Sequence, residues 1–397
     1  MCLSCFLVGQ CGNQIGSVLW PLILKEYGLL QQESDKKQPF KKVQEDAIHS
    51  FFYQVPEKTI SCSLDFKKSN LKARALLIDM EESVVQRFQT GPLRDLFDNA
   101  CSLTNYPGSG NNWAVGYFTH GGEQKSIIKE MLRSAAEKCD RLHCFLQVFS
   151  LGGGTGSGLG SAILPLLEEQ FPKVDRVAVC VHPGVNNDVV TSPYNIAFSM
   201  KKLVEYASCV FPLDNKAILD ICDRLGAPAE LKTWSPYKNI NSVIAKMLLA
   251  LTSGARFPGT LNLDISDIAT NMVPFYRLNF LSSSLFPIKL PKANGFRIMN
   301  RESEQIFRVC AKENQLLRID PMKGRLFGAT LLSRSKAPLS DLRQNIERYF
   351  CSILFLLILY SALRFSLSPH TVIRTHGPYT WPHCKVFANI GSVSIIH

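Results

Sequence analysis

The stretch SLGGGTGSG at residues 150–158 decides the fold, because its five glycines join a strand pattern to a helix pattern. An apolar run, residues 145–149, precedes it. Backbone N–H groups in such a turn are accessible, and the N-terminus of the following helix attracts anions. The stretch therefore predicts a phosphate-binding turn, with a plain tight connection as the alternative. The apolar residues at helical spacing after it are Leu159, Ile163, Leu166 and Leu167.

Two common nucleotide-binding motifs do not fit this turn. It contains no GxxxxGK sequence followed by serine or threonine, and no frame of GxGxxG matches it. The predicted phosphate site thus differs from a P-loop and from the strict dinucleotide fingerprint.

Two further glycine-containing loops follow apolar segments, at residues 9–16 and 108–112. Asp79 and Glu81 end a third apolar run, residues 76–78, and carboxylates at such a place hold a hydrated Mg²⁺ well. Taken singly, each is a turn, a helix cap or a solvated acid. Because ligands bind at the carboxyl ends of parallel strands, together they predict a site for a magnesium nucleotide.

Strand and helix patterns alternate along the chain. Short apolar runs at 76–78, 145–149 and 176–181 are separated by segments with helical periodicity. This order predicts an α/β fold with a doubly wound, mostly parallel sheet covered on both faces. The polar stretch from Gln31 to Lys72 is interpreted as a solvated surface insertion.

Composition sets broad limits. The 397 residues suffice for two domains, and 44 Lys plus Arg against 33 Asp plus Glu give a net charge of +11. Charge of this size affects solubility and steering, and we expect no nucleic-acid partner. The 13 cysteines have no paired CxxC spacing, so we expect reduced thiols in a cytosolic protein. The N-terminus lacks the pattern of a secretory signal.

The last segment, residues 349–397, contains no Asp or Glu. Its mostly apolar run at 349–363 is shorter than the roughly 20 residues that a membrane-spanning helix needs, so no membrane partner is expected. Prolines and a glycine after this run indicate turns and irregular chain. We interpret the segment as a truncated or altered end of the chain in preference to an anchor.

Several strings together resemble the tubulin family, and the resemblance extends from about Phe6 to Arg348. Within the family the chain is most similar to the epsilon type, for example in ARALLIDMEESVV (73–85) and SDLRQNIER (340–348). The family strings are GQCGNQIG (9–16), GSGNNWAVGYFTHG (108–121), GGGTGSG (152–158), SPYN (192–195), LDNKAILDIC (213–222), ARFPGTLNLD (255–264) and NMVPF (271–275).

The resemblance implies a domain organisation. A GTP-binding domain would occupy residues 1–222, a central helix region 223–252 and a second α/β domain 253–348. The divergent tail, 349–397, would stand where the family has a C-terminal helical hairpin, which this chain would lack.

The resemblance also implies which residues bind GTP or GDP and Mg²⁺. Asp79 and Glu81 would order the metal and its water. The others would contact phosphate, ribose or base: Gln10, Cys11, Gln14, Gly110, Asn111, Gly152, Gly153, Gly154, Thr155, Gly156, Asp188, Tyr237 and Asn241. Tyr206 would replace an asparagine that contacts guanine in most members, which weakens the expectation of strict guanine specificity.

In this family the next subunit supplies an acid that activates water at the terminal phosphate, and the matching position is Asp267. Asp is one methylene shorter than the glutamate of alpha and epsilon types, so weak activation and slow hydrolysis are expected. The implied partners are other tubulin subunits in head-to-tail contact and centriolar proteins. The implied location is the cytoplasm, the cytoskeleton and the centrosome or centriole.

Two alternatives stay open from the sequence. One is a doubly wound oxidoreductase that uses the glycine turn for NAD, although the strict fingerprint is absent. The other is a truncated tubulin product without function. Comparing the binding of GTP with that of NAD separates these possibilities.

Overall fold

The structure is a computed structural model, and its described residues cover most of the N-terminal half and parts of the rest. They are 2–29, 48–55, 70–184, 189–225, 236–257, 264–273, 275–288, 308–320, 329–333, 373–374, 383–384 and 391–396. The predicted division into domains at 222, 252 and 348 stays a prediction.

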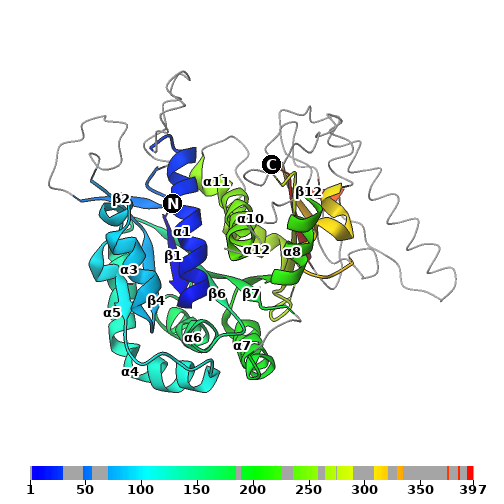
Figure 1. Cartoon of the computed structure of the whole chain (residues 1–397). Coiled ribbons are helices and arrows are strands. Elements are labelled where there is room, and N and C mark those ends of the chain that lie inside the picture. The colour runs from blue at the N-terminus through cyan, green and yellow to red at the C-terminus, as the bar shows by residue number, and fades with distance from the viewer. Residues whose placement is uncertain are drawn as a thin grey trace.

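A six-stranded sheet in the order β5-β4-β1-β6-β7-β8 forms the centre of the molecule (Figure 1), and every neighbouring pair in it is parallel. This confirms the predicted α/β fold, and the three apolar runs noted in the sequence all lie in its strands. The bounds are β1 (Cys2–Val8), β4 (Ala75–Asp79), β5 (Ser102–Thr104), β6 (Leu142–Ser150), β7 (Asp175–His182) and β8 (Cys209–Asp214).

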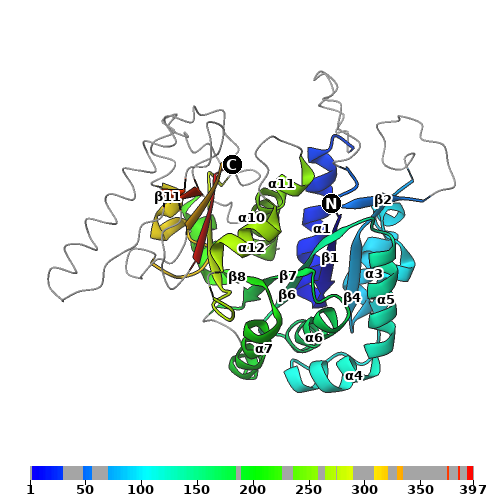
Figure 2. The same cartoon turned by 180° about the vertical axis from the view of Figure 1, so that it is seen from behind.

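Helices cover both faces of this sheet (Figures 1 and 2). One face carries α1, α3, α8, α10, α11 and α12, and the other carries α4, α5, α6 and α7. The bounds are α1 (Gly9–Glu26), α3 (Glu82–Thr90), α4 (Gly121–Glu123), α5 (Lys125–Glu137), α6 (Gly160–Gln170), α7 (Ser192–Tyr206), α8 (Asn215–Arg224), α10 (Pro236–Leu251), α11 (Ser253–Arg256) and α12 (Ile265–Met272).

The two faces have separate hydrophobic cores. Leu7 of β1 packs with residues of α1 and α10 on one side, whereas Phe6 and Val8 pack with residues of α5 and α6 on the other. Successive side chains of a strand point to opposite faces, so one continuous apolar strand serves both cores.

The prediction of a solvated insertion from Gln31 to Lys72 is wrong for its described residues around Phe51 and at its C-terminal end. Phe51 and Phe52 are buried and make edge-on ring contacts with Trp20 of α1. Strands β2 (Phe52–Gln54) and β3 (Leu71–Ala73) pair there as an antiparallel hairpin. Residues 31–47 and 56–69 lie outside the described residues. The sequence analysis missed the small core that the aromatic residues form, because most residues around them in the sequence are polar or charged.

A second, three-stranded sheet has the order β10-β13-β9 and is parallel throughout. Its strands are β9 (Leu281–Phe286), β10 (Ala329–Ser333) and β13 (Gly391–Ile396). The central strand, β13, comes from the tail that the sequence analysis expected to be irregular, so that expectation is wrong for residues 391–396. Short strands β11 (Ile373–Arg374) and β12 (His383–Cys384) pair with each other.

No helix among the described residues is both long and apolar enough to cross a membrane. The apolar run 349–363 and most of the tail in which the family's helical hairpin would stand lie outside those residues.

Candidate functional site

Two glycine loops meet at the carboxyl end of the central sheet. Gly9 has φ +71°, which turns the end of β1 directly into α1, and a Cβ on it would lie 2.9 Å from the backbone nitrogen of Gly156. A Cβ on Gly12 would lie 2.3 Å from the carbonyl oxygen of Val148, at the end of β6. Glycine at these two positions therefore lets the start of α1 lie directly against β6 and the turn that follows it.

The third loop, residues 108–112, packs onto the same turn. The hydroxyls of Ser109 and Thr155 are 2.9 Å apart and share a hydrogen bond. A Cβ on Gly154 would lie 2.6 Å from the backbone nitrogen of Asn112, so only glycine permits this approach. Gly110 and Asn111 both have φ +54° and are exposed. The three loops thus form one structure, termed here the cradle: residues 9–14, 108–112 and 152–156.

Asn195 of α7 joins two of these loops. Its Nδ2 donates to the carbonyl oxygens of Asn111 and Gly152, each at 2.8 Å, and its Oδ1 accepts from the backbone N–H of Trp113 at 3.0 Å. Thr191 also donates to the Asn111 carbonyl, at 2.6 Å. The sequence analysis quoted Asn195 only within a family string and assigned it no role. In the sequence, an amide side chain in the first turn of a predicted helix was the only signal that pointed to Asn195.

The cradle offers mainly backbone groups and uncharged side chains. Gln10 is exposed, while Cys11, Gln14, Gly153 and Thr155 are half-buried. Burial raises the pKa of the Cys11 thiol to about 12, so this side chain adds no negative charge near a phosphate. Accessible N–H groups and the N-terminus of α1 make an anion site of the kind that phosphates occupy. The remaining predicted glycines, Gly152, Gly154 and Gly156, are buried.

Asp79 and Glu81 lie at the edge of the cradle. Asp79 ends β4 and is buried, and its Oδ2 has no hydrogen-bond partner among the described residues. Burial, with a smaller effect of the Glu81 charge, raises the pKa of Asp79 to about 7. A Cβ on Gly108 would lie 3.3 Å from Oε1 of Glu81, which places that carboxylate against the third loop.

A metal ion would satisfy the unpartnered oxygen of Asp79. No group of three or more metal-binding side chains occurs among the described residues. Mg²⁺ needs no such group, because it keeps several waters and takes one or two carboxylates together with phosphate oxygens. The residues present therefore fit a hydrated Mg²⁺ held partly by a nucleotide.

The predicted base-binding residues are on a neighbouring helix. Tyr237 and Asn241 belong to α10, which packs along α1 (Figure 1). Tyr237 is 57% exposed at the first turn, and Asn241 is buried. Asp188, the predicted ribose contact, lies outside the described residues.

The match of Tyr206 to the family's base-contacting asparagine is wrong. Tyr206 ends α7 and precedes β8, so it lies at the amino end of the sheet, and Lys202 covers its ring at 5.2 Å. The six residues of β8 separate it from the cradle edge by roughly 17–20 Å. Asn215, the first residue of α8, follows β8 at that edge, and the sequence analysis assigned it no role.

Asp267 lies at the end of the sheet opposite the cradle. Its Oδ2 accepts from the backbone N–H of Asp264 at 3.1 Å, and Asp264 caps α12 in return. Oδ2 of Asp264 is 3.5 Å from Nδ1 of His143, near the start of β6. Since the cradle follows the other end of this nine-residue strand, the two places are roughly 25 Å apart. The described contact of Asp267 is a helix cap, and its catalytic role stays a prediction.

Comparison with known proteins agrees with this geometry. Residues 3–223 match the Tubulin/FtsZ family, GTPase domain. The tubulin epsilon chain of Mus musculus is 42% identical over 368 residues, covering 86% of this chain and 75% of its own length. The tubulin epsilon chain of Homo sapiens is 41% identical, with coverages of 88% and 77%. The tubulin beta-2 chain of Suillus bovinus is 34% identical, with coverages of 85% and 73%.

The family match removes the NAD-dependent oxidoreductase as an alternative, because the matched domain is a GTPase domain. By that match and by these identities, the chain belongs to the tubulin family of GTP-binding cytoskeletal proteins, and it is more similar to the two epsilon chains than to the beta chain.

Proposed function

We propose that this chain is a polymer subunit that binds GTP with Mg²⁺ and contacts other tubulin subunits head to tail. Its GTP hydrolysis is slow and needs the next subunit, and it acts in microtubule organisation at centrioles or basal bodies. The observation that carries the proposal is the separation of the cradle from Asp267 by the length of β6. A residue so placed serves the nucleotide of a neighbour and not its own.

In this proposal the cradle holds the phosphates. Backbone N–H groups of the β6–α6 turn and the start of α1 donate to phosphate oxygens, and Gly110 and Asn111 lie nearest the terminal phosphate. Asp79 and Glu81 orient the waters of Mg²⁺, which supplies charge neutralisation to the phosphates. Tyr237 stacks on the base, and Asn241 and Asn215 offer polar groups to its edge.

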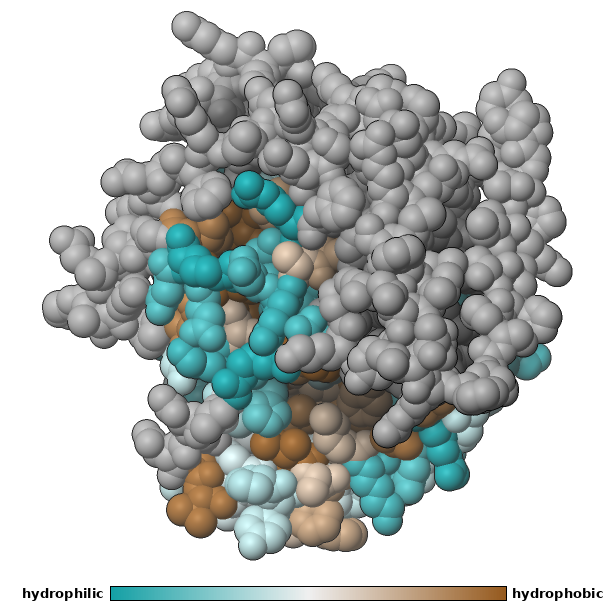
Figure 3. All heavy atoms as spheres, turned by 90° about the vertical axis from the view of Figure 1, so that its right-hand side faces the viewer, coloured by the Kyte–Doolittle hydropathy of each residue, from teal (hydrophilic) through white to brown (hydrophobic). Residues whose placement is uncertain are grey.

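Exposed apolar side chains at both ends of the molecule support head-to-tail contact. Near the cradle, Val190 and Tyr194 are 86% and 67% exposed. At the opposite end Phe275 and Tyr276 are 63% and 71% exposed, and Tyr276 donates to the carbonyl oxygen of Glu205 near the end of α7. Figure 3 shows brown, hydrophobic residues exposed at the bottom of the molecule, the level of α7 in Figure 1. Exposed apolar residues that lie together in a patch are typical of protein–protein contacts.

The slow rate follows from how Asp267 is held. One carboxylate oxygen already accepts from the backbone of Asp264, and the side chain is short. A carboxylate drawn back onto its own helix reaches less far toward a neighbour's terminal phosphate, and a misplacement of about 1 Å lowers a rate on the order of 100-fold. The centriolar part of the proposal rests on the similarity to the two epsilon chains.

Nucleotide binding by the purified full-length chain tests the proposal most directly. We expect GTP and GDP to bind with an affinity that Mg²⁺ increases for GTP, and ATP and NAD to bind far more weakly. Absence of GTP binding by a folded chain would contradict the proposal and favour a product without function. Imaging of a tagged chain against a centriole marker in ciliated cells tests the location, and a diffuse signal would refute that part alone.

A further inference from the structure

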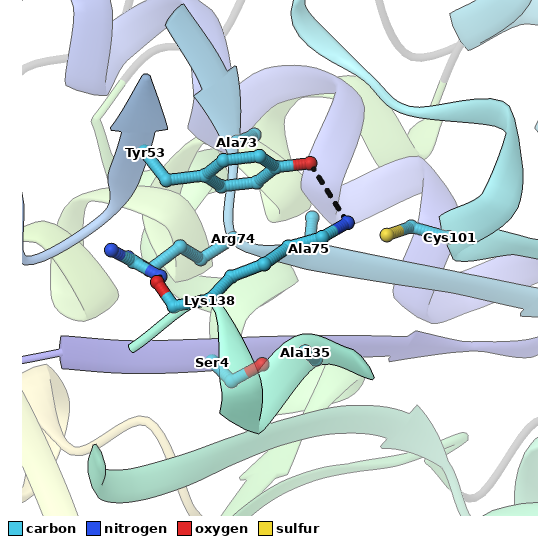
Figure 4. A pocket seen from close by; sticks show the side chains of 8 residues that line it. All are labelled: Ser4, Tyr53, Ala73, Arg74, Ala75, Cys101, Ala135 and Lys138. Atoms are coloured by element: carbon cyan, nitrogen blue, oxygen red, sulfur yellow. Dashed lines mark hydrogen bonds between the residues drawn. The ribbon is translucent and has the colours of Figure 1, made fainter. Parts of the chain in front are cut away.

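A small cavity lies near the amino end of the central sheet, between the β2–β3 hairpin and α5 (Figure 4). The residues that line it are three alanines and five polar residues: Ser4, Tyr53, Arg74, Cys101 and Lys138. The cavity is partly open to solvent, and the room inside is about that of one water molecule. It therefore suits a single small group that exchanges with solvent.

Arg74 brings a buried positive charge to this cavity. It lies between β3 and β4 and is 8% exposed. Its Nε donates to the carbonyl oxygens of His49 and Phe52. Its Nη1 donates to the carbonyl oxygen of Lys138 at 2.5 Å and to the Sγ of Cys139 at 3.1 Å. Its Nη2 has no partner among the described residues. These contacts fix the guanidinium, but all of them are made to uncharged groups.

Lys138, which follows α5, brings a second positive charge. Figure 4 shows its Nζ at the hydroxyl of Tyr53, to which it donates at 3.3 Å. The same Nζ pairs with Asp98 at 3.2 Å, whereas no carboxylate in the described part of the chain pairs with Arg74. Nζ of Lys138 lies 4.9 Å from the centre of the Tyr53 ring, and the guanidinium carbon of Arg74 lies 5.6 Å from it. Asp98 balances one of these two cations, so one positive charge remains.

The other polar groups at the cavity are neutral. Burial raises the pKa of the Tyr53 hydroxyl to about 12, and it also raises the pKa of the Cys101 thiol. The Cys139 thiol donates to the carbonyl oxygen of Ala135 at 3.4 Å, so this sulfur carries its proton. Ser4 is 2% exposed, and its hydroxyl has no described hydrogen-bond partner, which leaves it available as a donor. Because a buried cation is costly without a negative charge nearby, these groups favour an anion in the cavity.

We propose that this cavity binds one small monovalent anion, such as chloride, at Arg74 and Lys138. A chloride ion is only slightly larger than a water molecule, and it accepts hydrogen bonds from guanidinium, ammonium and hydroxyl groups. The small room inside excludes organic acids and phosphates. The bound anion balances the buried charge and links the β2–β3 hairpin to α5. Because the cradle lies at the other end of the sheet, this site is separate from the nucleotide site.

Thermal unfolding of the full-length chain in different sodium salts tests the proposal. Gluconate is too large for the cavity. Replacing it by chloride at the same ionic strength should raise the melting temperature by about 2–5 °C, as a ligand at roughly ten times its Kd would. The rise should saturate with chloride concentration, and bromide should act as chloride does. An equal melting temperature in chloride and gluconate, or a rise that does not saturate, would overturn the proposal.

Two lysine variants separate the cavity from an ordinary surface ion pair. Lys138 pairs with Asp98 and Lys129 pairs with Glu169, and the two lysine side chains are 29% and 28% exposed. Of these two lysines, only Lys138 lines the cavity. Lys138→Met should therefore lose most of the chloride-dependent shift, and Lys129→Met should keep it. Equal shifts in the two variants would contradict the proposed site.

Crystals of the full-length chain grown in bromide locate the anion directly. We expect an anomalous difference peak inside the cavity, within hydrogen-bond distance of the Arg74 guanidinium. An ordered water molecule there without an anomalous peak would overturn the proposal, even in protein whose melting temperature responds to chloride.

Discussion

The two ends of the central sheet carry different kinds of residue. At the carboxyl end, glycine loops, hydroxyls and amides form the cradle, and its acids lie at the rim. At the amino end, charged side chains and a thiol make the contacts: Arg74 donates to Cys139, and Asp264 lies beside His143. Backbone N–H groups bind an anion without adding a negative charge that would repel it. Charged side chains instead favour contact with a charged partner. The difference shows that the two ends of one sheet present different chemistry, because the strands end there in loops of different composition.

The largest effect is expected from closing the cradle with a methyl group. Gly154→Ala would place a Cβ 2.6 Å from the backbone nitrogen of Asn112, so the third loop must move. Overpacking of this kind costs about 1–3 kcal/mol, and GTP affinity should fall up to about 100-fold. Gly122→Ala is the control, because nothing lies within 4 Å of its Cβ position. Titration with GTP measures both. Equal affinity of the two variants would show that the third loop does not contribute.

A second test changes Asp267, at the amino end of the sheet. Asp267→Glu lengthens the side chain and keeps the reciprocal cap of α12, since glutamate is favoured at this position of a capping box. Hydrolysis in head-to-tail assemblies should become about 10- to 100-fold faster. Asp267→Asn keeps an oxygen for the Asp264 N–H and should abolish the activation while GTP binding stays intact. Phosphate release per assembled subunit is the measurement. Unchanged release by both variants would exclude Asp267 as the activator.

A third test concerns the residue that joins the loops. Asn195→Ala removes one of the donors to each of the carbonyls of Asn111 and Gly152, and it removes the acceptor of the Trp113 N–H. Each such loss costs about 1–3 kcal/mol, and GTP affinity should drop about 10- to 30-fold. Ser192→Ala removes a single hydrogen bond to Gly152, at 3.2 Å, and should have a smaller effect on affinity. If the two variants bind GTP equally, Asn195 does not position the cradle.

The smallest effect is a pH dependence of Mg²⁺ binding. The pKa of Asp79 in the folded chain is about 7, above the ordinary 3.8, so without metal the folded state holds this proton more tightly than the unfolded state does. This group therefore stabilises the metal-free fold fully below pH 4, and that contribution is lost as pH rises toward 7. Mg²⁺ needs the carboxylate, so the magnesium enhancement of GTP binding should grow up to about tenfold between pH 6 and pH 8. Asp79→Asn should remove this pH dependence, and its persistence in that variant would assign it to another group.

Much of the fold was predictable because it depends on local sequence. Continuous apolar runs such as 145–149 gave strands of the parallel sheet, and the glycine turn after them gave a strand-to-helix connection. Loops at the ends of parallel strands must converge, so the approach of residues 9–14, 108–112 and 152–156 also followed. The nucleotide-binding roles of individual cradle residues remain predictions.

Other features depended on contacts between distant segments. Phe51 and Phe52 lie in a polar stretch, and only the packing against Trp20 makes them core residues. The sequence analysis placed Tyr206 at the wrong end of the sheet. Matching its position to that of a family residue does not show whether it comes before or after the strand β8. The tail strand β13 pairs with β9 and β10, more than 50 residues away along the chain, and nothing local in GSVSII names those partners.

The sequence by itself indicated the family through the resemblance of its motifs. It also determined the parallel α/β sheet and the glycine loops, since these depend on periodicity and on the backbone freedom of glycine. Only the tertiary structure decided that Asn195 joins two loops, that Asp267 caps its own helix far from the cradle, and that Arg74 lies beside the Cys139 thiol. Each of those contacts joins or orients groups whose relative position is set by packing, and no periodic pattern along the chain records it.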